Sequence, residues 1–308
     1  MIDLTPYITL LKQGEVVAFP TETVYGLGAD ARNPSAIKKI YRTKGRPADN
    51  PLIVHVSSLE QVKEFANEIP ELAKKLMDTF WPGPLSVVLP KKPEVLDLIT
   101  AGLDTVALRM PNHEIALSII KQTGALVAPS ANSSGKPSPT SAGHVSEDFG
   151  IDFPVVDGGK TTIGLESTVV DCSGSTPSIL RPGSVSKAQL ESATGVKFKE
   201  SFNSKDSHAP KSPGQKYTHY KPAANVIWTG DAEYLDESTL FLLSGRAPDM
   251  PNVISYNNDL DQFASELYDR FRQADHKGYT QIAVELNENL SSHPMYAALL
   301  NRISKAVG

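Results

Sequence analysis

Polar loops follow short apolar runs at several places in this 308-residue sequence, and they hold the residues best suited to chemistry. They supply small hydroxyl groups, backbone N–H groups beside glycines, and single arginine or lysine side chains. The loops are Pro20–Gly28, Lys44–Asn50, Arg109–Asn112, Pro129–Ser138, Gly164–Thr168 and Arg181–Ser184. If they meet, they form a donor-rich pocket that suits a polyanion such as ATP together with a small carboxylate ligand. Arginine is favoured where such a group must be held at two points.

Other chemical signatures in the sequence are weak. Gly159–Thr161 matches the end of a phosphate-binding P-loop, but Pro154 stands where that loop needs a glycine. Gly26–Ala31 fits a dinucleotide-binding pattern, but no strand ending in an acidic residue follows about twenty residues later. The histidines are scattered, which disfavours a zinc site, and no Ser-His-Asp or Cys-His order is evident. We therefore expect catalysis by positioning and electrostatics rather than by a protein nucleophile.

Composition excludes several classes of protein. Apolar residues make up 40% of the chain, so we expect a packed core. The formal net charge is -5, which argues against a general nucleic-acid coat protein because such a protein needs a broad positive field. The single cysteine, Cys172, rules out a disulfide framework. The N-terminus lacks a signal-peptide pattern, and no apolar run is long enough to span a membrane. We expect a soluble protein of the cytoplasm.

Two basic segments interrupt this mildly acidic chain. Between Ala31 and Ala48 there are six basic residues and no acidic one, and Lys205–Lys221 carries four lysines and two histidines. Either segment could be an ordinary solvated helix face or linker. Either could also form a local anion site, and charge alone does not separate the two interpretations.

The first 198 residues predict an α/β domain with a twisted, mixed sheet, because short apolar runs alternate with helical patterns. Asn33 and Pro34 predict the start of a helix that ends near Thr43, and Ser57 with Glu60 predicts a capping box before the next helix. We expect strands at Glu15–Phe19, Leu52–Val56, Leu85–Leu89, Val106–Met110, Leu126–Ala128, Val155–Asp157 and Thr168–Cys172.

Residues 199–222 read as a linker because apolar periodicity gives way to Pro, Gly, Ser and Lys. Residues 223–308 then predict a smaller, Rossmann-like α/β domain with parallel strands. Its clearest element is an amphipathic helix whose apolar residues recur over four turns from Leu260 to Ala274. This domain is acidic, so we expect it to position the linker or contact partner proteins rather than to dock RNA.

The loops and their flanking strands resemble a known family. FPTETVYGLG, KGRPADNPLIVHV, FWPGPLSVVL, AGLDTVALRMPNH, APSANSSGKPSPT, ESTVVD and ILRPGSV follow one another in the order seen in the YrdC-like domain of L-threonylcarbamoyladenylate synthases. The similarity covers about Gly14–Gly195. SPGQKYTHYKP, at Ser212–Pro222, resembles the linker of the long, two-domain form of that family. The resemblance therefore implies a YrdC-like sheet domain followed by a C-terminal α/β domain.

The resemblance implies a nucleotidyltransferase reaction that uses Mg²⁺ with ATP. L-threonine, bicarbonate and ATP would give threonylcarbamoyl-AMP and pyrophosphate. The product would feed a threonylcarbamoyl-transferase complex that forms N6-threonylcarbamoyladenosine at position 37 of tRNA. No membrane partner is implied, and any contact with RNA would be weak.

The family motifs also assign roles to individual residues. Lys44 and Arg46 would screen the reacting charges, and Mg²⁺ ligands are not assigned. The residues implied to bind L-threonine are Thr23, His55, Arg109, Ala128 through its backbone, and Ser167. Those implied to bind ATP are Arg46, Asn50, Thr105, Ser130, Ser138, Arg181 and His219. Lys216, Tyr217 and Tyr220 would belong to a linker that acts as a lid.

Simpler roles remain open for each of these residues. His55 could be a hydrogen-bonded strand histidine, Arg181 a surface ion pair, and Ser130 and Ser138 turn formers. The chain as a whole could be an RNA-binding module without catalysis, with the Ala31–Ala48 segment and the linker as its footprint. It could also be a related carbamoyl-transfer enzyme, although we find none of the zinc-binding or acylphosphatase-like segments expected there.

Overall fold

The computed structural model describes residues 2–202, 220–229 and 236–307. Within them, a nine-stranded sheet of mixed direction runs in the order β1-β2-β6-β3-β5-β4-β7-β8-β9. Parallel pairs such as β3 with β5 and β4 with β7 alternate with antiparallel ones. The strands are β1 (Val17–Phe19), β2 (Gly26–Asp30), β3 (Ile53–His55), β4 (Leu85–Pro90), β5 (Thr105–Arg109), β6 (Leu126–Val127), β7 (Thr168–Asp171), β8 (Ser178–Arg181) and β9 (Lys199–Glu200). The predicted mixed sheet is confirmed.

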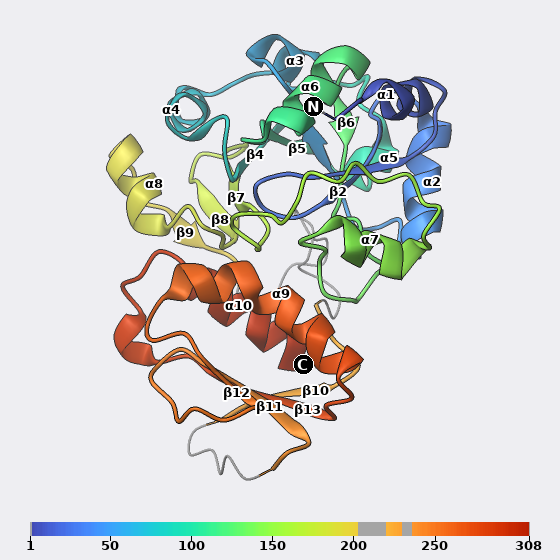
Figure 1. Cartoon of the computed structure of the whole chain (residues 1–308). Helices are drawn as coiled ribbons and strands as arrows, with labels where there is room; N and C mark the ends of the chain where they lie inside the picture. The colour runs from blue at the N-terminus through green and yellow to red at the C-terminus, as the bar shows by residue number, and fades with distance from the viewer. Residues whose placement is uncertain (1, 203–219, 230–235, 308) are drawn as a thin grey trace.

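Short helices pack around this sheet (Figure 1). They are α1 (Thr5–Lys12), α2 (Pro34–Lys44), α3 (Leu59–Phe65), α4 (Glu71–Phe80), α5 (Asp97–Thr100), α6 (Glu114–Thr123), α7 (Ala142–Phe149) and α8 (Lys187–Thr194). Asn33 caps α2 as predicted, because its side chain accepts hydrogen bonds from two first-turn amides. The predicted capping box is wrong by one residue, since Ser58 caps α3 and Ser57 instead bonds the side chain of Gln61. In the described part of the chain, no helix combines the length and apolarity needed to cross a membrane.

Two local predictions differ from the structure. Val155–Asp157 is not a regular strand: Val155 forms only an isolated bridge with Ala18. Gly26–Asp30, placed mostly in a polar loop, is strand β2 and pairs with both β1 and β6. Gly28 makes this close packing possible, because a Cβ there would lie 2.6 Å from the ring of Phe19. The antiparallel pairing with β1 also excludes a dinucleotide-binding turn at this position.

A second, four-stranded sheet forms the smaller unit, in the order β10-β13-β11-β12 with every pair parallel. This confirms the predicted parallel α/β architecture. Its elements are β10 (Asn225–Trp228), β11 (Thr239–Leu243), β12 (Val253–Ser255), α9 (Leu260–His276), β13 (Gln281–Glu285), the 3-10 helix Glu288–Leu290 and α10 (Tyr296–Val307). The exact division into residues 1–198, 199–222 and 223–308 stays a prediction, although β9 places Lys199 and Glu200 in the larger sheet.

Helices α9 and α10 lie between the smaller sheet and the larger unit (Figure 1). The hydrophobic core around them includes Val24 and Leu165 from loops of the larger unit. Gly164 packs directly against the backbone of α9, since a Cβ there would lie 2.5 Å from the Cα of Ser265. The smaller unit therefore packs directly against loops that carry candidate site residues.

This close approach predicts a specific cost for Gly164→Ala. Gly164 and Gly159 share a left-handed backbone, at φ +78° and +83°, but a Cβ at Gly159 would meet nothing within 4 Å. Gly159→Ala should therefore cost only the conformational strain, about 1–2 kcal/mol. Gly164→Ala should cost about 1–3 kcal/mol more, because α9 must move away. Urea unfolding of both variants measures the difference, and equal midpoints would contradict this account of the contact.

Candidate functional site

The predicted loops converge on one cavity at the larger unit's side of α9 and α10. Its lining residues include four cationic side chains that were predicted from three separate loops: Lys44, Arg46, Arg109 and Arg181. The predicted hydroxyl residues Thr23, Ser130, Ser138 and Ser167 and the linker residue Tyr220 line the same cavity. The structure thus brings together side chains that are up to about two hundred residues apart in sequence.

Other predicted site residues lie elsewhere or outside the described chain. His55 and Ala128 are buried beside the cavity rather than lining it: His55 is the register partner of Arg109, and the Ala128 amide bonds the Ile53 carbonyl. Asn50 is buried, with neither polar atom of its side chain bonded to another described residue. Thr105 begins β5, at the opposite end of that strand from Arg109. Lys216, Tyr217 and His219 lie outside the described residues.

Arg109 is fixed deep in the site. Its Nη1 donates to Thr23 Oγ1 at 2.8 Å, and its Nε donates to the Gly83 carbonyl at 3.2 Å. Its Nη2 lies 2.7 Å from the Glu22 carboxylate, as an ion pair in which both side chains are buried. Sequence reasoning missed Glu22. The only signal was its position between two threonines in the Pro20–Gly28 loop.

Arg181 also lines the cavity, where Ser167 holds its guanidinium group. Its Nε donates to the Ser167 carbonyl at 3.0 Å, and its Nη2 donates to Ser167 Oγ at 3.1 Å. Ser167 Oγ also lies 2.8 Å from Ser86 Oγ. Burial lowers the pKa of Arg181, and nearby Arg302 acts in the same direction. This arginine is therefore an inward-facing, preorganised donor and not the surface ion pair considered from the sequence.

Glu166 is a second acidic residue that sequence reasoning missed. Its carboxylate accepts a hydrogen bond from Ser138 Oγ at 2.5 Å. It also forms an ion pair with Arg302, whose Nε lies 2.8 Å away. Burial alone would raise its pKa, but Arg302 and Arg181 outweigh this and lower the pKa to about 2. Glu166 is therefore ionised at neutral pH, at the edge of a cavity lined by cations.

Lys44 clamps the loop that forms one rim of the cavity. Its ammonium group donates to the carbonyl oxygens of Ser130 and Asn132 at 2.6 and 2.5 Å. Burial lowers its pKa well below the usual lysine value, and Arg46 adds to this effect. Lys44 thus lines the cavity while its hydrogen bonds hold the loop.

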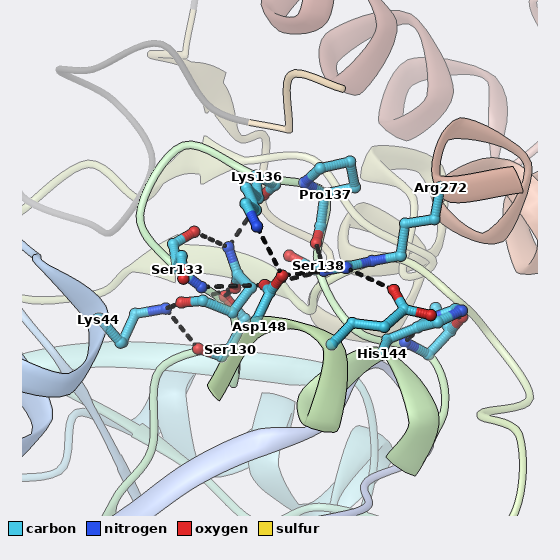
Figure 2. Close-up of polar contacts among 12 residues, drawn as sticks. Lys44, Ser130, Ser133, Lys136, Pro137, Ser138, His144, Asp148 and Arg272 are labelled. Carbon is cyan, nitrogen blue, oxygen red and sulfur yellow. Dashed lines mark hydrogen bonds and ion pairs between the residues drawn. The ribbon is translucent and has the colours of Figure 1, made fainter. Parts of the chain in front are cut away.

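Asp148 holds the same rim from the other side (Figure 2). Its carboxylate accepts from the Ser133 amide and from Lys136 Nζ, each at 3.1 Å. Arg272 of α9 bonds this carboxylate at 3.1 and 3.2 Å and also donates to the Pro137 carbonyl at 2.7 Å. The rim of the cavity is thus tied directly to the smaller unit, as Figure 2 shows.

The Ala31–Ala48 segment does not form a continuous exposed basic surface. Lys44 and Arg46 line the cavity. Arg32 and Lys39 form ion pairs with Glu64 and Glu15. Part of the basic charge is thus turned inward and part is paired with acidic side chains, which supports a local anion site over an RNA footprint.

The acidic side chains of the described residues are not clustered as the ligands of a bound metal ion would be. Among the described residues, no three His, Cys, Asp or Glu side chains are grouped as metal ligands could be. The acidic residues of the site, Glu22 and Glu166, are each paired with an arginine.

His55 makes stability depend on pH. Burial, reinforced by Arg109, lowers its pKa to about 3. The unfolded chain binds this proton near pH 6.5 while the folded chain does not, so falling pH favours unfolding. Between about pH 7 and pH 4, the wild type should lose about 3 kcal/mol more unfolding free energy than His55→Gln. Urea unfolding at both pH values tests this, and equal losses in the two proteins would refute it.

The sequence of the chain matches known proteins over nearly its whole length. The family model described as "Telomere recombination" matches residues 9–183, and the model described as "Threonylcarbamoyl-AMP synthase, C-terminal domain" matches residues 185–308. The chain is 43% identical to a threonylcarbamoyl-AMP synthase of Bacillus subtilis, over 97% of this chain and 91% of the relative. It is also 43% identical to a threonylcarbamoyl-AMP synthase of Pyrococcus abyssi, over 97% and 92%.

A solved structure extends the similarity to the whole fold. The crystal structure of P. abyssi Sua5 complexed with L-threonine matches with a TM-score of 0.90 and 41% identity, covering 99% of this chain and 94% of that one. The α/β fold class and the family resemblance are both confirmed. The chain, with its cation-lined cavity and its second α/β unit, belongs to the threonylcarbamoyl-AMP synthase family.

Proposed function

We propose that this chain is an L-threonylcarbamoyladenylate synthase whose reaction takes place in the cavity between Arg109 and Arg181. The substrates are L-threonine, bicarbonate and ATP, and the products are threonylcarbamoyl-AMP and pyrophosphate. One observation carries the proposal: four buried or partly buried cations from three separate loops line one cavity together with small hydroxyl groups. Family membership supplies the reaction, and the cavity supplies groups that fit its charges.

The reaction brings anions together. The threonine amine first condenses with bicarbonate to form a carbamate, releasing water. A carbamate oxygen then attacks the α-phosphorus of ATP, a new P–O bond forms, and pyrophosphate leaves with the electron pair of the broken P–O bond. Lys44 and Arg46 screen the approach of carbamate and triphosphate. One such charge at about 4 Å contributes about 4 kcal/mol gross at an effective dielectric near 20.

Arg109 is the proposed partner of the threonine carboxylate. It is buried and ordered by Thr23 and Gly83, so little side-chain entropy is lost when a carboxylate binds. Thr23 and Ser167 would offer hydroxyl groups, and Ala128 its carbonyl oxygen. His55 supports Arg109 from the neighbouring strand and is neutral at neutral pH.

ATP would bind along the wall formed by Arg46, Ser130, Ser138 and Arg181, which line the cavity together. Asn50 contributes if its buried, unpartnered amide turns toward the nucleotide. Thr105 and His219 complete the proposed ATP residues by family resemblance. Mg²⁺ would enter as the complex with ATP, held mainly by phosphate oxygens and water.

The product is an activated mixed anhydride, so a transferase must consume it. We propose that a threonylcarbamoyl-transferase complex uses it to modify adenosine 37 of tRNA in the cytoplasm. The relatives named as threonylcarbamoyl-AMP synthases support this assignment.

Isotope exchange between pyrophosphate and ATP tests the proposal. The enzyme should catalyse exchange only when both L-threonine and bicarbonate are present, because carbamate formation precedes attack on ATP. The alternative, an RNA-binding module without catalysis, predicts no exchange and tRNA binding that weakens steeply with salt. Exchange that needs neither threonine nor bicarbonate would contradict the proposed reaction.

A further inference from the structure

Glu166 is the only acidic residue among the described residues that line the cavity. A carboxylate in this place is costly, because the proposed ligand carries several negative charges. At close range in a buried site, like charges repel strongly. The chain must therefore compensate Glu166 before a triphosphate can bind beside it.

The compensating charge comes from the smaller unit. Arg302, on α10, is fully buried, and its Nε donates to Glu166 Oε2 at 2.8 Å. Its Nη2 also donates to the Glu166 carbonyl at 3.4 Å. From α9, Tyr268 donates its hydroxyl to the same carboxylate at 3.1 Å. Both helices of the smaller unit thus hold one acidic side chain at the edge of the cavity.

The carboxylate is in turn joined to a proposed ATP residue. Glu166 Oε1 accepts from Ser138 Oγ at 2.5 Å, and Ser138 lines the cavity. Arg181, another lining residue, and Lys305 of α10 also act electrostatically on this group. The charge balance at this wall is therefore set jointly by the two units.

Arg302 also contacts the side chain of Tyr220. Its guanidinium group lies 5.5 Å from the centroid of the Tyr220 ring, a cation–π distance. The Tyr220 ring also stacks on the ring of Tyr268, with ring centroids 5.3 Å apart. Tyr220 lines the cavity, as Glu166 does. Arg302 therefore contacts two lining residues of the cavity, Glu166 and Tyr220.

We propose that Arg302 is a positioning residue for nucleotide binding: by neutralising and holding Glu166 from the smaller unit, it makes the cavity able to accept the triphosphate of ATP. Arg302 acts through Glu166 and does not touch the substrate. The inference rests on the proposed function. It gives the smaller unit a direct electrostatic role in ATP affinity.

A double-mutant cycle tests the proposal on the full chain. Arg302→Met fills similar volume without charge, and Glu166→Gln keeps an acceptor for Ser138 without charge. Calorimetry should measure the Kd of MgATP and of L-threonine for the wild type, both single variants and Glu166→Gln/Arg302→Met. Arg302→Met should weaken MgATP binding at least about tenfold, while L-threonine binding changes less than about threefold.

The remaining variants separate charge from structure. Glu166→Gln should bind MgATP at least as tightly as the wild type, and the double variant should recover to within about threefold of the wild type. Arg302→Lys, which keeps the charge, should also retain most of the affinity. A merely structural role for Arg302 predicts instead that every variant weakens both ligands together.

The following outcomes would overturn the proposed role of Arg302. A folded Arg302→Met variant with wild-type MgATP affinity, or a folded double variant as weak as a single Arg302 variant, would overturn the proposal. If Arg302→Met does not fold because Glu166 is left buried and unpaired, the sign of the Glu166→Gln effect decides, and weaker MgATP binding there overturns it. A wild type that binds neither ligand would instead overturn the proposed function, so the two failures are distinguishable.

Discussion

Replacing Arg109 by alanine should abolish detectable binding of L-threonine. The guanidinium group is buried, is held by Thr23 and Gly83, and lines the cavity as the proposed partner of the carboxylate. Losing charge-assisted hydrogen bonds to the ligand should raise the Kd for L-threonine at least about 100-fold. Titration calorimetry with L-threonine, followed by MgATP, measures the loss and shows whether the nucleotide still binds.

The variant also leaves the Glu22 carboxylate buried without its ion pair. This should cost about 3–5 kcal/mol of folding stability, and it could be mistaken for the cause of lost binding. Glu22→Gln/Arg109→Ala is the matched control, because it removes the buried charge. This double variant should recover much of the thermal stability and still not bind L-threonine. Retained threonine binding in either variant would show that Arg109 is not the carboxylate partner.

Replacing Arg46 by alanine should have the largest effect on turnover. The guanidinium group of Arg46 donates to the carbonyl groups of Asn50 and Pro51, and Arg46 lines the cavity. Removing one preorganised cation from a site where charge develops should lower kcat/KM in the exchange assay about 10²–10³-fold. Steady-state exchange rates over a range of ATP concentrations provide the measurement.

Arg42 supplies the matched control for that experiment. It lies on α2 in the same basic segment but is exposed to solvent and does not line the cavity. Arg42→Ala removes the same formal charge and should change kcat/KM less than about twofold. Equal losses in the two variants would point to a diffuse basic surface, as an RNA-binding module requires, rather than to a site.

The sequence predicted best those elements whose signals are local. The apolar period of Leu260–Ala274 identified α9, and Asn33 with Pro34 identified the start of α2. The order of the polar loops also predicted the cavity, because each loop follows a buried strand or apolar run and carries donors. Capping at Ser58 rather than Ser57 was missed because adjacent serines offer the same signal.

The electrostatic partners of the site could not be found in this way. Glu166 lies 136 residues from Arg302, and Asp148 lies 124 residues from Arg272. Nothing in the local pattern of α9 or α10 distinguishes these arginines from solvent-exposed ones, since their partners are defined only by how the two units pack. Glu22 was not paired with Arg109 in advance because the two residues are far apart in sequence and meet only through the folding of the larger unit.

A crystal structure of the chain with L-threonine and a non-hydrolysable MgATP analogue would test the central claim most directly. The account predicts the amino-acid carboxylate at Arg109 and the triphosphate against Arg46, Ser130 and Arg181, with the α-phosphorus facing the amino group. Ligands bound in separate places, or a nucleotide that touches none of these residues, would contradict it.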